Sequence, residues 1–448
     1  MRVKKTREMR SRKGMRVKAH RKGLVLVAVL WVVVLLTVIV AALGRDNRLD
    51  TKVCLAGTEG LRCKWACRAG IETAVAVLNE DLRGSDSLGD LWSENDEDFN
   101  DIELEQCFFT VRVVDEASKL NVNRATRKQL LELPNMTEEI ADAIIDWRDR
   151  NDTPRQGGAE RGYYENLRYG YKIRNGRLRT IRELLLVKGV TEELLYGEDT
   201  NFNGKLDYNE KDGDESPPLD DKDDELDKGW IAYLTCYSYD KNRDAGGNER
   251  ININEADENR LEESLQIKKS YAKWIVENRS NNNYRSIADL INKNSPKEPK
   301  KDSENDSDEA EPLDLETFSN IADKITVSDR EKIPGRININ TAPKVVLVAL
   351  LGGGDTAEQL ADEIITYRGT LIGGMQSIAE MMKVKSVEID TFKKLANYIT
   401  TRSDVFTVRS FAIASRNGVS GARLETEAVV DRSSTPCKVL YWYQGANN

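Results

Sequence analysis

The hydrophobic pattern near the N-terminus predicts one long helix that begins in a membrane. Residues 24–43 form an uncharged, largely apolar run, and about twenty such residues are enough to cross a bilayer as a helix. The chain then continues from residue 49 to 82 without proline, with apolar residues at helical spacing at Ala74, Val75, Val77 and Leu78. We therefore expect a membrane helix over residues 24–44 that runs on into an amphipathic helix.

A second pattern, the alternation of apolar and polar residues, predicts a β-sheet. It occurs at residues 107–115 and returns only near the C-terminus, where turns separate three runs at residues 406–414, 422–430 and 438–443. The expected fold is α+β, a spine helix packed on an antiparallel β-sheet. Residues 45–116 would supply the helix and first strand, residues 401–448 the other strands, and residues 117–400 a large helical domain inserted in the sheet.

The inserted region contains a threefold repeat, which indicates a small helical unit used three times. Each copy begins with an apolar residue and Asn-x-Asn-x-Ala, at residues 121–125, 252–256 and 338–342. An amphipathic helix ending in arginine follows, at residues 140–148, 271–279 and 360–368. A Ser or Thr with an acid three positions later, the capping-box pattern, predicts a second short helix after Thr180, Ser286 and Ser377.

Such units resemble helix-hairpin-helix and SAM-like modules, so DNA binding has to be considered. A phosphate-binding hairpin offers backbone amides from a glycine-rich turn. The first copy has Pro134, Asn135 and Met136 at this place, and only the third has glycines, at residues 352–354. Neither hairpin is rich in Lys or Arg. We therefore expect no nucleic-acid partner and a domain that serves protein contacts.

The charge distribution favours the same conclusion. Residues 1–23 hold 11 of the 67 Lys and Arg and one acid, Glu8, which leaves 56 basic and 75 acidic residues and a net charge of −19 for the rest. Such a body repels phosphate groups and attracts divalent cations. The single histidine, His20, lies in the basic segment, so the body has no imidazole for nucleophile pairs or zinc. Carboxylate-only catalysis would survive this argument, but no pair of acids stands apart, and we expect no enzyme.

The residues around the apolar run predict how it is oriented and processed. Basic residues before it place the N-terminus in the cytoplasm and everything after Arg45 outside. No small-x-small cleavage site is evident before Arg45 and Asp46, so the span would be retained, as in a plain signal anchor. However, Gly23 and Leu24 lie at the junction of the basic and apolar segments, where prepilin peptidases cut. Residues 1–23 would then be a cytoplasmic leader peptide.

At this point a family resemblance becomes specific. Residues 23–31, Gly-Leu-Val-Leu-Val-Ala-Val-Leu-Trp, and residues 69–72, Ala-Gly-Ile-Glu, resemble a type II secretion system minor pseudopilin, the general secretion pathway protein K family. Most pilins carry glutamate at the fifth mature position, whereas Ala28 stands there in this chain, and absence of the acid is characteristic of this family. A carboxylate in the bilayer is costly unless it is paired, so a subunit without one suits the end of a filament.

The resemblance implies a pilin-like fold with an inserted helical domain, and a calcium-binding function for that domain. It implies cleavage by prepilin peptidase, methylation of the new N-terminus, and a single-pass inner-membrane protein with a periplasmic body. The implied function is to form the pseudopilus tip with the I- and J-type minor pseudopilins and to start assembly of the major pseudopilin. This assembly supports export of folded proteins, and the exported proteins are further candidate partners. The alternatives are a type IV pilus minor pilin and a membrane-tethered DNA-uptake receptor.

Residues 199–210 match the twelve-residue calcium loop of EF-hands, with glycine at position six and an apolar residue at position eight. The predicted ligands are Asp199, Asn201, Asn203, the carbonyl of Lys205, Asp207 and Glu210. Gly213 and two prolines follow, so the loop would be an isolated calcium site and not a sensor pair. An acidic turn without a metal is the alternative.

A second acidic run, residues 220–227, aligns less well with the same motif. It would place Asp221, Asp223 and Asp227 at ligand positions, but Asp224 replaces the glycine and Trp230 the terminal glutamate. We treat these three acids as weaker calcium ligands.

The cysteine count permits disulfides in an extracytoplasmic body. Cys63 and Cys67 lie one helical turn apart, which suits bridges to other elements, and metal binding by this pair is the alternative. The full set of candidates is Cys54, Cys63, Cys67, Cys107, Cys236 and Cys437.

Two segments have the composition of loops. Residues 292–312 are rich in Lys, Glu, Asp and Ser and predict a disordered linker. Residues 151–175 contain four tyrosines, which would either contact a partner or cover their own domain.

Overall fold

A computed structural model describes residues 21–199, 206–213, 222–279, 282–291, 309–416 and 419–445, together with 215, 216, 218 and 220. The chain divides into two compact units, Met1–Leu61 and Arg62–Asn448. A single helix, α1 (Arg21–Glu80), crosses the boundary between them. In the first unit its apolar side chains from residue 25 to 43 are exposed, and this stretch is long and apolar enough to cross a membrane. The predicted long apolar helix is therefore present.

In the second unit, the end of α1 packs on a β-sheet through one apolar stripe. Cys63, Cys67, Ile71, Ala74 and Leu78 are each no more than 1% exposed, and their spacing of three or four residues places them on one face. The helix approaches the sheet closely at Gly70, where an added Cβ would lie 2.4 Å from Ser410 Oγ. A larger residue there would push the helix off the sheet.

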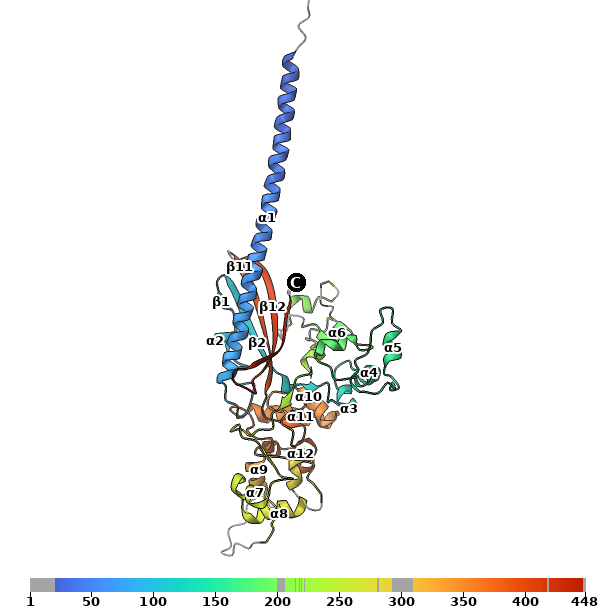
Figure 1. Cartoon of the computed structure of the whole chain (residues 1–448), viewed down its shortest axis with the longest axis vertical. Coiled ribbons are helices and arrows are strands. Elements are labelled where there is room, and N and C mark those ends of the chain that lie inside the picture. Colours follow the sequence, from blue (N-terminus) through green and yellow to red (C-terminus); the bar gives the residue numbers. More distant parts are fainter. Residues whose placement is uncertain are drawn as a thin grey trace, which may run out of the picture. The chain divides into compact units, whose positions relative to one another are not determined.

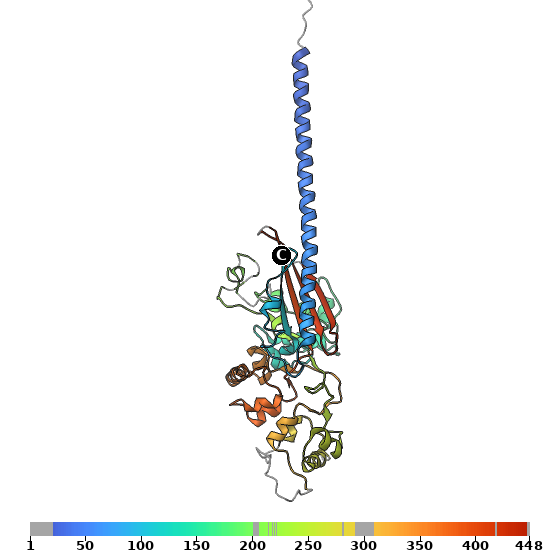
Figure 2. The same cartoon turned by 90° about the vertical axis from the view of Figure 1, so that its left-hand side faces the viewer.

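The sheet is antiparallel and has five strands in the order β1-β2-β11-β12-β13. These are β1 (Ile102–Leu104), β2 (Cys107–Asp115), β11 (Val405–Arg416), β12 (Val419–Asp431) and β13 (Lys438–Gly445). β2 pairs directly with β11, Phe406 lying opposite Asp115, although the whole inserted domain separates them in sequence. Figures 1 and 2 show the end of α1 running along this sheet. The predicted α+β fold is confirmed.

The inserted domain contains three units with the same order of main elements: a strand, two helices, a short 3-10 helix, a further helix and a closing strand. The first contains β3 (Leu120–Asn121), α3 (Arg127–Leu131), α4 (Glu138–Arg148), η2 (Ile181–Leu186), α6 (Glu192–Tyr196) and β4 (Leu234–Thr235). The second contains β6 (Ile251–Asn252), α7 (Glu258–Leu265), α8 (Lys269–Arg279), η5 (Ile287–Leu290), α9 (Leu315–Ile321) and β7 (Ile325–Thr326). The third contains β9 (Ile337–Asn338), α10 (Lys344–Leu351), α11 (Asp355–Gly369), η6 (Ile378–Lys383), α12 (Ile389–Leu395) and β10 (Ile399–Thr400).

Equivalent side chains hold each unit together. An arginine in the last turn of the second helix donates to two carbonyl groups of the Asn-x-Asn-x-Ala segment, and this holds for Arg148, Arg279 and Arg368. The second asparagine exchanges two hydrogen bonds with one backbone residue, Asn123 with Leu178, Asn254 with Tyr284 and Asn340 with Met375. The opening and closing strands of each unit pair in parallel. The three units therefore share the same internal hydrogen bonds and strand pairing.

The short second helices differ from the prediction, because η2, η5 and η6 are 3-10 turns. The capping box forms at Ser286 with Asp289, but Thr180 makes no side-chain cap bond. Its expected partner Glu183 instead accepts from Trp147 Nε1 at 3.1 Å and pairs with Arg174. These tertiary contacts use one carboxylate oxygen of Glu183, while its Oε2 still accepts from Arg179 N at 3.1 Å, just before the 3-10 segment.

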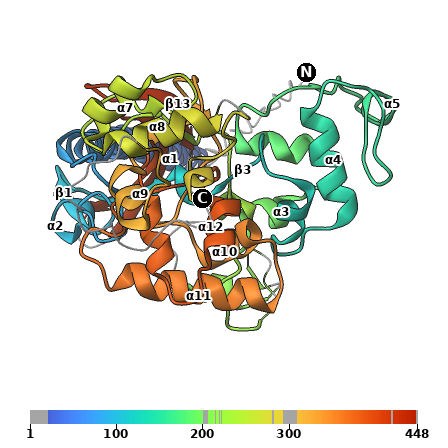
Figure 3. The same cartoon turned by 90° about the horizontal axis from the view of Figure 1, so that it is seen from below.

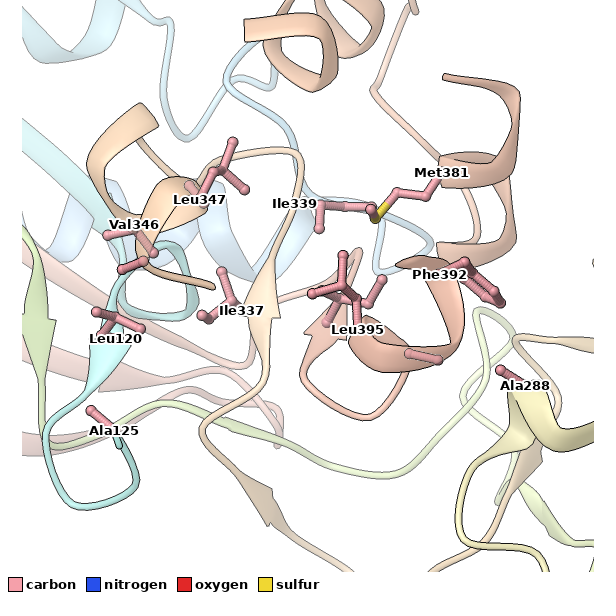
Figure 4. Close-up of a cluster of buried hydrophobic side chains, with 14 of the residues drawn as sticks. Leu120, Ala125, Ala288, Ile337, Ile339, Val346, Leu347, Met381, Phe392 and Leu395 are labelled. Carbon is pink, nitrogen blue, oxygen red and sulfur yellow. The ribbon is translucent and has the colours of Figure 1, made fainter. Parts of the chain in front are cut away.

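One hydrophobic core extends through all three repeats. In Figure 4, Ile337 of β9 and Ile339, just after this strand, lie among four side chains of the same repeat: Val346 and Leu347 of α10, Met381 and Leu395. Leu120 and Ala288 belong to the first and second repeats and to the same core. α3 and α10 lie side by side (Figures 1 and 3). A separate, smaller core lies between α1 and the sheet.

Further elements complete the chain. They are α2 (Asp96–Phe99), η1 (Glu116–Ser118), α5 (Arg161–Glu165), η3 (Tyr208–Glu210), η4 (Trp230–Ala232), β5 (Tyr239–Asp240) and β8 (Ile333–Pro334). The predicted linker at residues 292–312 falls mostly outside the described residues.

Candidate cation-binding sites

The predicted calcium loop is described only in part. Asp199, Asp207 and Glu210 are described, whereas Asn201, Asn203 and Lys205 lie outside the described residues. Asp199 is 7% exposed and Glu210 is 1% exposed. Acids so thoroughly buried require a compensating charge or hydrogen bonds.

Glu210 is the central group of this first candidate site. Its Oε2 accepts a hydrogen bond from Asp207 N at 2.9 Å, but its Oε1 is buried and has no hydrogen-bond partner among the described residues. Burial raises the pKa of Glu210, and the nearby charges of Asp199, Asp207 and Glu198 raise it further. Carboxylates that crowd in this way are ligands suited to a hard cation such as calcium.

The second acidic run makes a smaller contribution. Asp221 lies outside the described residues, and Asp223 Oδ1 accepts from Glu225 N at 2.7 Å within its own turn. Asp227 lies beside the first loop, because its N–H donates to Glu198 Oε2 at 3.1 Å and its carbonyl accepts from Glu198 N at 2.9 Å. Of these three acids, Asp227 is the one that the backbone brings to the start of residues 199–210.

A second carboxylate cluster, which the sequence patterns did not indicate, lies between α4 and α5. Carboxylate oxygens of Asp146, Asp149 and Glu160 come within 4.8 Å of one another. Asp146 is fully buried and Glu160 is 4% exposed. Both carboxylate oxygens of Glu160 lack a hydrogen-bond partner among the described residues, and so does the buried Oδ1 of Asn175. We name Asp146, Asp149 and Glu160 the α4–α5 cluster.

The backbone around the α4–α5 cluster is shaped to enclose it. A Cβ on Gly158 would lie 1.9 Å from Asp146 Oδ2, so the chain can pass close to this carboxylate only as glycine. Asp146 Oδ2 also accepts from Arg155 N at 3.0 Å, and Arg155 Nε is 3.4 Å from Oδ1. Arg155 is half exposed, and one cation at the rim does not balance two buried acids and a third, partly buried one.

The acids of the cluster raise the pKa of Glu160 through their negative charges. Burial raises the pKa of Glu160 to about 7, and the negative charges of Asp146, Asp149 and Asp152 add to the shift. Burial likewise raises the pKa of Asp146. Oxygen ligands held close together, with buried oxygens left unbonded, fit a divalent cation that takes oxygen ligands.

One sequence signal could have indicated this cluster. Asp146 occupies a position on the buried side of the amphipathic helix 140–148, between Ile145 and Trp147. A charged residue on an apolar face needs a partner. Because Glu160 follows only after a loop, no spacing motif links the two acids.

Both candidate sites lie in extensions of the first repeat. Between the second helix and the 3-10 turn, the first repeat has residues 149–180, where the others have 280–286 and 370–377. Before the closing strand it has residues 197–233, where the others have 322–324 and 396–398. The third repeat shows that the unit can be built without these extensions, so they serve something other than the basic fold.

The tyrosine-rich loop partly covers its own domain. Tyr164 is fully buried and packs on Trp147 with ring centroids 5.1 Å apart, and Tyr171 lies 6.3 Å from Trp147. Tyr163 and Tyr169 remain 42% and 79% exposed. Tyr164 and Tyr171, which pack on Trp147, therefore hold in place the loop that carries Glu160.

The third hairpin does not present an open phosphate-binding surface. Gly352, Gly353 and Gly354 all have positive φ, but a Cβ on Gly353 would lie 1.9 Å from Glu132 Oε1. The carboxylate of Glu132, from the first repeat, therefore faces the glycine turn that a phosphate would occupy in a DNA-binding module.

The cysteines fall in three environments. Cys63, Cys67 and Cys107 are buried between α1 and the sheet, Cys236 and Cys437 are partly buried, and Cys54 is exposed.

Two family models match the chain, both described as Type II secretion system (T2SS), protein K. One covers residues 107–196, which include β2 and the first repeat through α6, and the other covers residues 337–402, which are the third repeat. The chain belongs to the type II secretion system protein K family. In this protein K the two matched segments contain the α4–α5 cluster and the third-repeat glycine hairpin, respectively.

A chain of the GspK-GspI-GspJ complex from the type 2 secretion system of enterotoxigenic Escherichia coli is similar to this protein K in structure, with a TM-score of 0.46. The two are 14% identical over 88% of this chain and 99% of that chain. No curated protein matched the sequence.

Proposed function

We propose that this protein K is a minor pseudopilin that forms the tip of a pseudopilus and starts its assembly for export of folded proteins. The observation that supports this most directly is the combination of protein K repeats with a 60-residue helix packed on a β-sheet. An apolar helix of this kind can be stored in the membrane and then pack beside equivalent helices in a filament. The partners would be I- and J-type minor pseudopilins, followed by the major pseudopilin.

Ala28 supports a place at the end of the filament. In a pilin with glutamate at this position, the carboxylate needs a partner in the apolar surroundings. The apolar side chain of Ala28 makes no such demand on a neighbouring subunit. The inserted domain would then cover the tip, where secreted proteins could contact it.

Affinity capture of the full-length chain, tagged at its C-terminus and extracted in mild detergent, tests this function. Two other pilin-like subunits in stoichiometric amounts are expected. Recovery of the chain alone, or with a type IV pilus machinery, would contradict the proposal.

Processing at Gly23 belongs to the same proposal. Prepilin peptidase would remove residues 1–23 and leave a methylated Leu24 at the N-terminus, with the chain in the inner membrane and its body in the periplasm. N-terminal sequencing of the membrane-bound protein should begin at Leu24. Gly23→Val should keep the leader attached, whereas Gly44→Ala, beyond the junction, should be processed normally. An intact leader on the wild-type chain, in cells with active peptidase, would refute the proposal.

We further propose that calcium binds both candidate sites and holds the extensions of the first repeat in place. Glu210, with Asp199 and Asp207, would be ligands in one site, and Asp146, Asp149 and Glu160 in the other. The ion would bring positive charge to the buried carboxylates of Glu210, Asp146 and Glu160. We assign the ion a structural role, because it would neutralise buried carboxylates that belong to two extensions of the first repeat.

A DNA-uptake receptor is the second candidate function, because the repeats resemble helix-hairpin-helix units. The carboxylate of Glu132 against Gly353 counts against it, since it repels phosphate. Binding to a radiolabelled duplex at low and moderate salt separates the two functions. Salt-dependent binding would favour the receptor, and we expect none.

A further inference from the structure

Two buried cysteine sulfurs meet between the spine helix and the first long strand. Cys63 lies on α1 and Cys107 is the first residue of β2, and both side chains are fully buried. Their Sγ atoms are 3.9 Å apart. The neighbouring residues are also joined, since Arg62 Nη1 donates to Gln106 Oε1 at 2.8 Å. Helix and strand are therefore held side by side at this point.

A third cysteine nearby has a different environment. Cys67, one turn further along α1, donates to Ser410 O and Leu424 O, each at 3.3 Å. Its sulfur faces the central strands β11 and β12. The chain thus provides a matched control for Cys63, because Cys67 has the same residue type, helix and burial but different neighbours.

We propose that Cys63 and Cys107 form a disulfide that joins α1 to β2. A disulfide needs the sulfurs about 2.05 Å apart, so rotations of the two side chains have to close less than 2 Å. The proposal rests on the proposed function, because it requires that the body lies outside the cytoplasm, where disulfides persist.

The reaction is a thiol–disulfide exchange with an oxidised dithiol oxidoreductase of the cell envelope. One cysteine thiolate attacks the enzyme's disulfide and forms a mixed disulfide. The second cysteine thiolate then attacks that bond, which forms Cys63–Cys107 and releases the enzyme as a dithiol. Both electrons pass to the enzyme's disulfide, and the two cysteine protons balance the two thiols that it gains.

The burial of the pair sets the order of events. Burial raises the pKa of the Cys63 thiol to about 12, with a further contribution from Cys107, so little thiolate exists once the sheet is complete. The Cys63 thiol also lies 3.2 Å from Ala422 O of β12. Oxidation should therefore precede docking of the C-terminal strands. The bond would fix β2 to the helix while the inserted domain is still being made.

The test uses the full-length chain in membranes, with thiols blocked by N-ethylmaleimide under denaturing conditions before digestion. Trypsin separates the two helix cysteines, because it cuts after Arg62, Lys64 and Arg68. We expect Cys63-Lys64 linked to the peptide of residues 84–112, which contains Cys107, and Cys67 fully alkylated on its own peptide. Cys67→Ser should keep the linked peptide, whereas Cys63→Ser and Cys107→Ser should each abolish it.

Alkylation of both Cys63 and Cys107 in the wild-type chain would overturn the proposal, as would a link from Cys107 to Cys67. Zinc released in proportion to these thiols would also overturn it. Labelling of the exposed Cys54 by a membrane-impermeant maleimide in spheroplasts reports the topology separately. If Cys54 is labelled and Cys63 is not linked, the disulfide is refuted while the membrane orientation stands.

Discussion

At the scale of single residues, the carboxylates with unbonded oxygens are the most informative. Glu160 and Glu210 are both almost completely buried, and each leaves oxygen atoms without a hydrogen-bond partner among the described residues. A neutral amide would be cheaper to bury than such a charge. The retention of an acid at each place is explained if a cation supplies the missing contacts.

Glu160→Gln and Glu210→Gln should therefore each reduce the stabilisation by calcium. Saturating one site at a hundredfold excess over Kd adds about 2.7 kcal/mol to the free energy of unfolding. Each variant should lose most of the stabilisation that calcium binding at one site provides. The measurement is the difference in thermal unfolding temperature between samples with calcium and samples with chelator. Glu165→Gln and Asp224→Asn, exposed acids near the two sites, are the controls and should behave as wild type. Full calcium response in both site variants would exclude these ligands.

Asp404 gives a prediction for pH. Burial raises its pKa to about 6, and the charge of Asp240 adds to the shift, while Arg432 opposes it. The folded chain thus holds this proton more tightly than the unfolded chain, whose aspartate pKa is about 3.9. Protonated Asp404 therefore contributes to the free energy of unfolding below about pH 4, and this contribution is lost as the pH rises through about 6.

Asp404→Asn should remove this loss and keep an oxygen to accept the hydrogen bond from Lys241 N. At pH 7.5 the variant should be more stable than wild type by up to about 3 kcal/mol, because a shift of about two pKa units is worth about 1.4 kcal/mol per unit, and at pH 4 the two should be nearly equal. Denaturant unfolding at both pH values measures the difference. A variant less stable than wild type at pH 7.5 would show that the Asp404 charge is favourable in the folded protein.

At the scale of elements, one arginine per repeat ties a helix end to the opening loop. Arg279 Nη1 donates to Ile253 O at 2.9 Å and to Ala256 O at 2.6 Å, and Arg368 Nη1 donates to Ile339 O and Ala342 O at 2.7 Å each. Burial lowers the pKa of Arg368 to about 10, which leaves it charged at neutral pH. The guanidinium needs no carboxylate partner here, because the two carbonyl oxygens present the negative ends of their dipoles to it.

Arg368→Met should destabilise the protein by about 2 kcal/mol, because two carbonyl groups lose a charged donor while the side-chain volume is roughly kept. Arg279→Met should have a similar effect through the second repeat. Arg285→Met, at an exposed arginine, should be close to neutral. Equal unfolding midpoints for Arg368→Met and Arg285→Met would show that the repeated bonds add nothing to stability.

The elements also show what the sequence could and could not predict. Regular patterns identified the strand at residues 107–115 to the residue and the ends of two helices at Arg148 and Arg279, while the helix predicted to end at Arg368 ends one residue later, at Gly369. The closing strands of the repeats were missed, because two residues such as Ile399–Thr400 are too short to show alternation. The α4–α5 cluster was missed for a related reason. Its acids meet through the fold of the loop 149–160, and no local spacing records that contact.

At the scale of the molecule, stability should be unevenly distributed. The third repeat lacks the two extensions, and its hydrogen bonds and core need no ion. The first repeat carries both carboxylate groups and the long loop 149–180 that holds Glu160. Segments with few apolar contacts and strong repulsion open most easily, so cation binding should act on this region and not on the whole body.

Chelation of calcium should therefore expose the first repeat to protease while the rest stays resistant. The loop 149–180 has several basic residues, including Arg150, Arg155 and Arg161, so trypsin can report its opening. With calcium bound, Glu160 and Asp146 are held together through the ion, and the loop should be cut slowly. With chelator, repulsion among these acids favours the open loop, and cleavage there should be several-fold faster. Cleavage after Lys385, in the third repeat, should keep its rate and serves as the internal control. If both regions are cut faster, calcium stabilises the body globally; if neither changes, the α4–α5 cluster does not hold calcium.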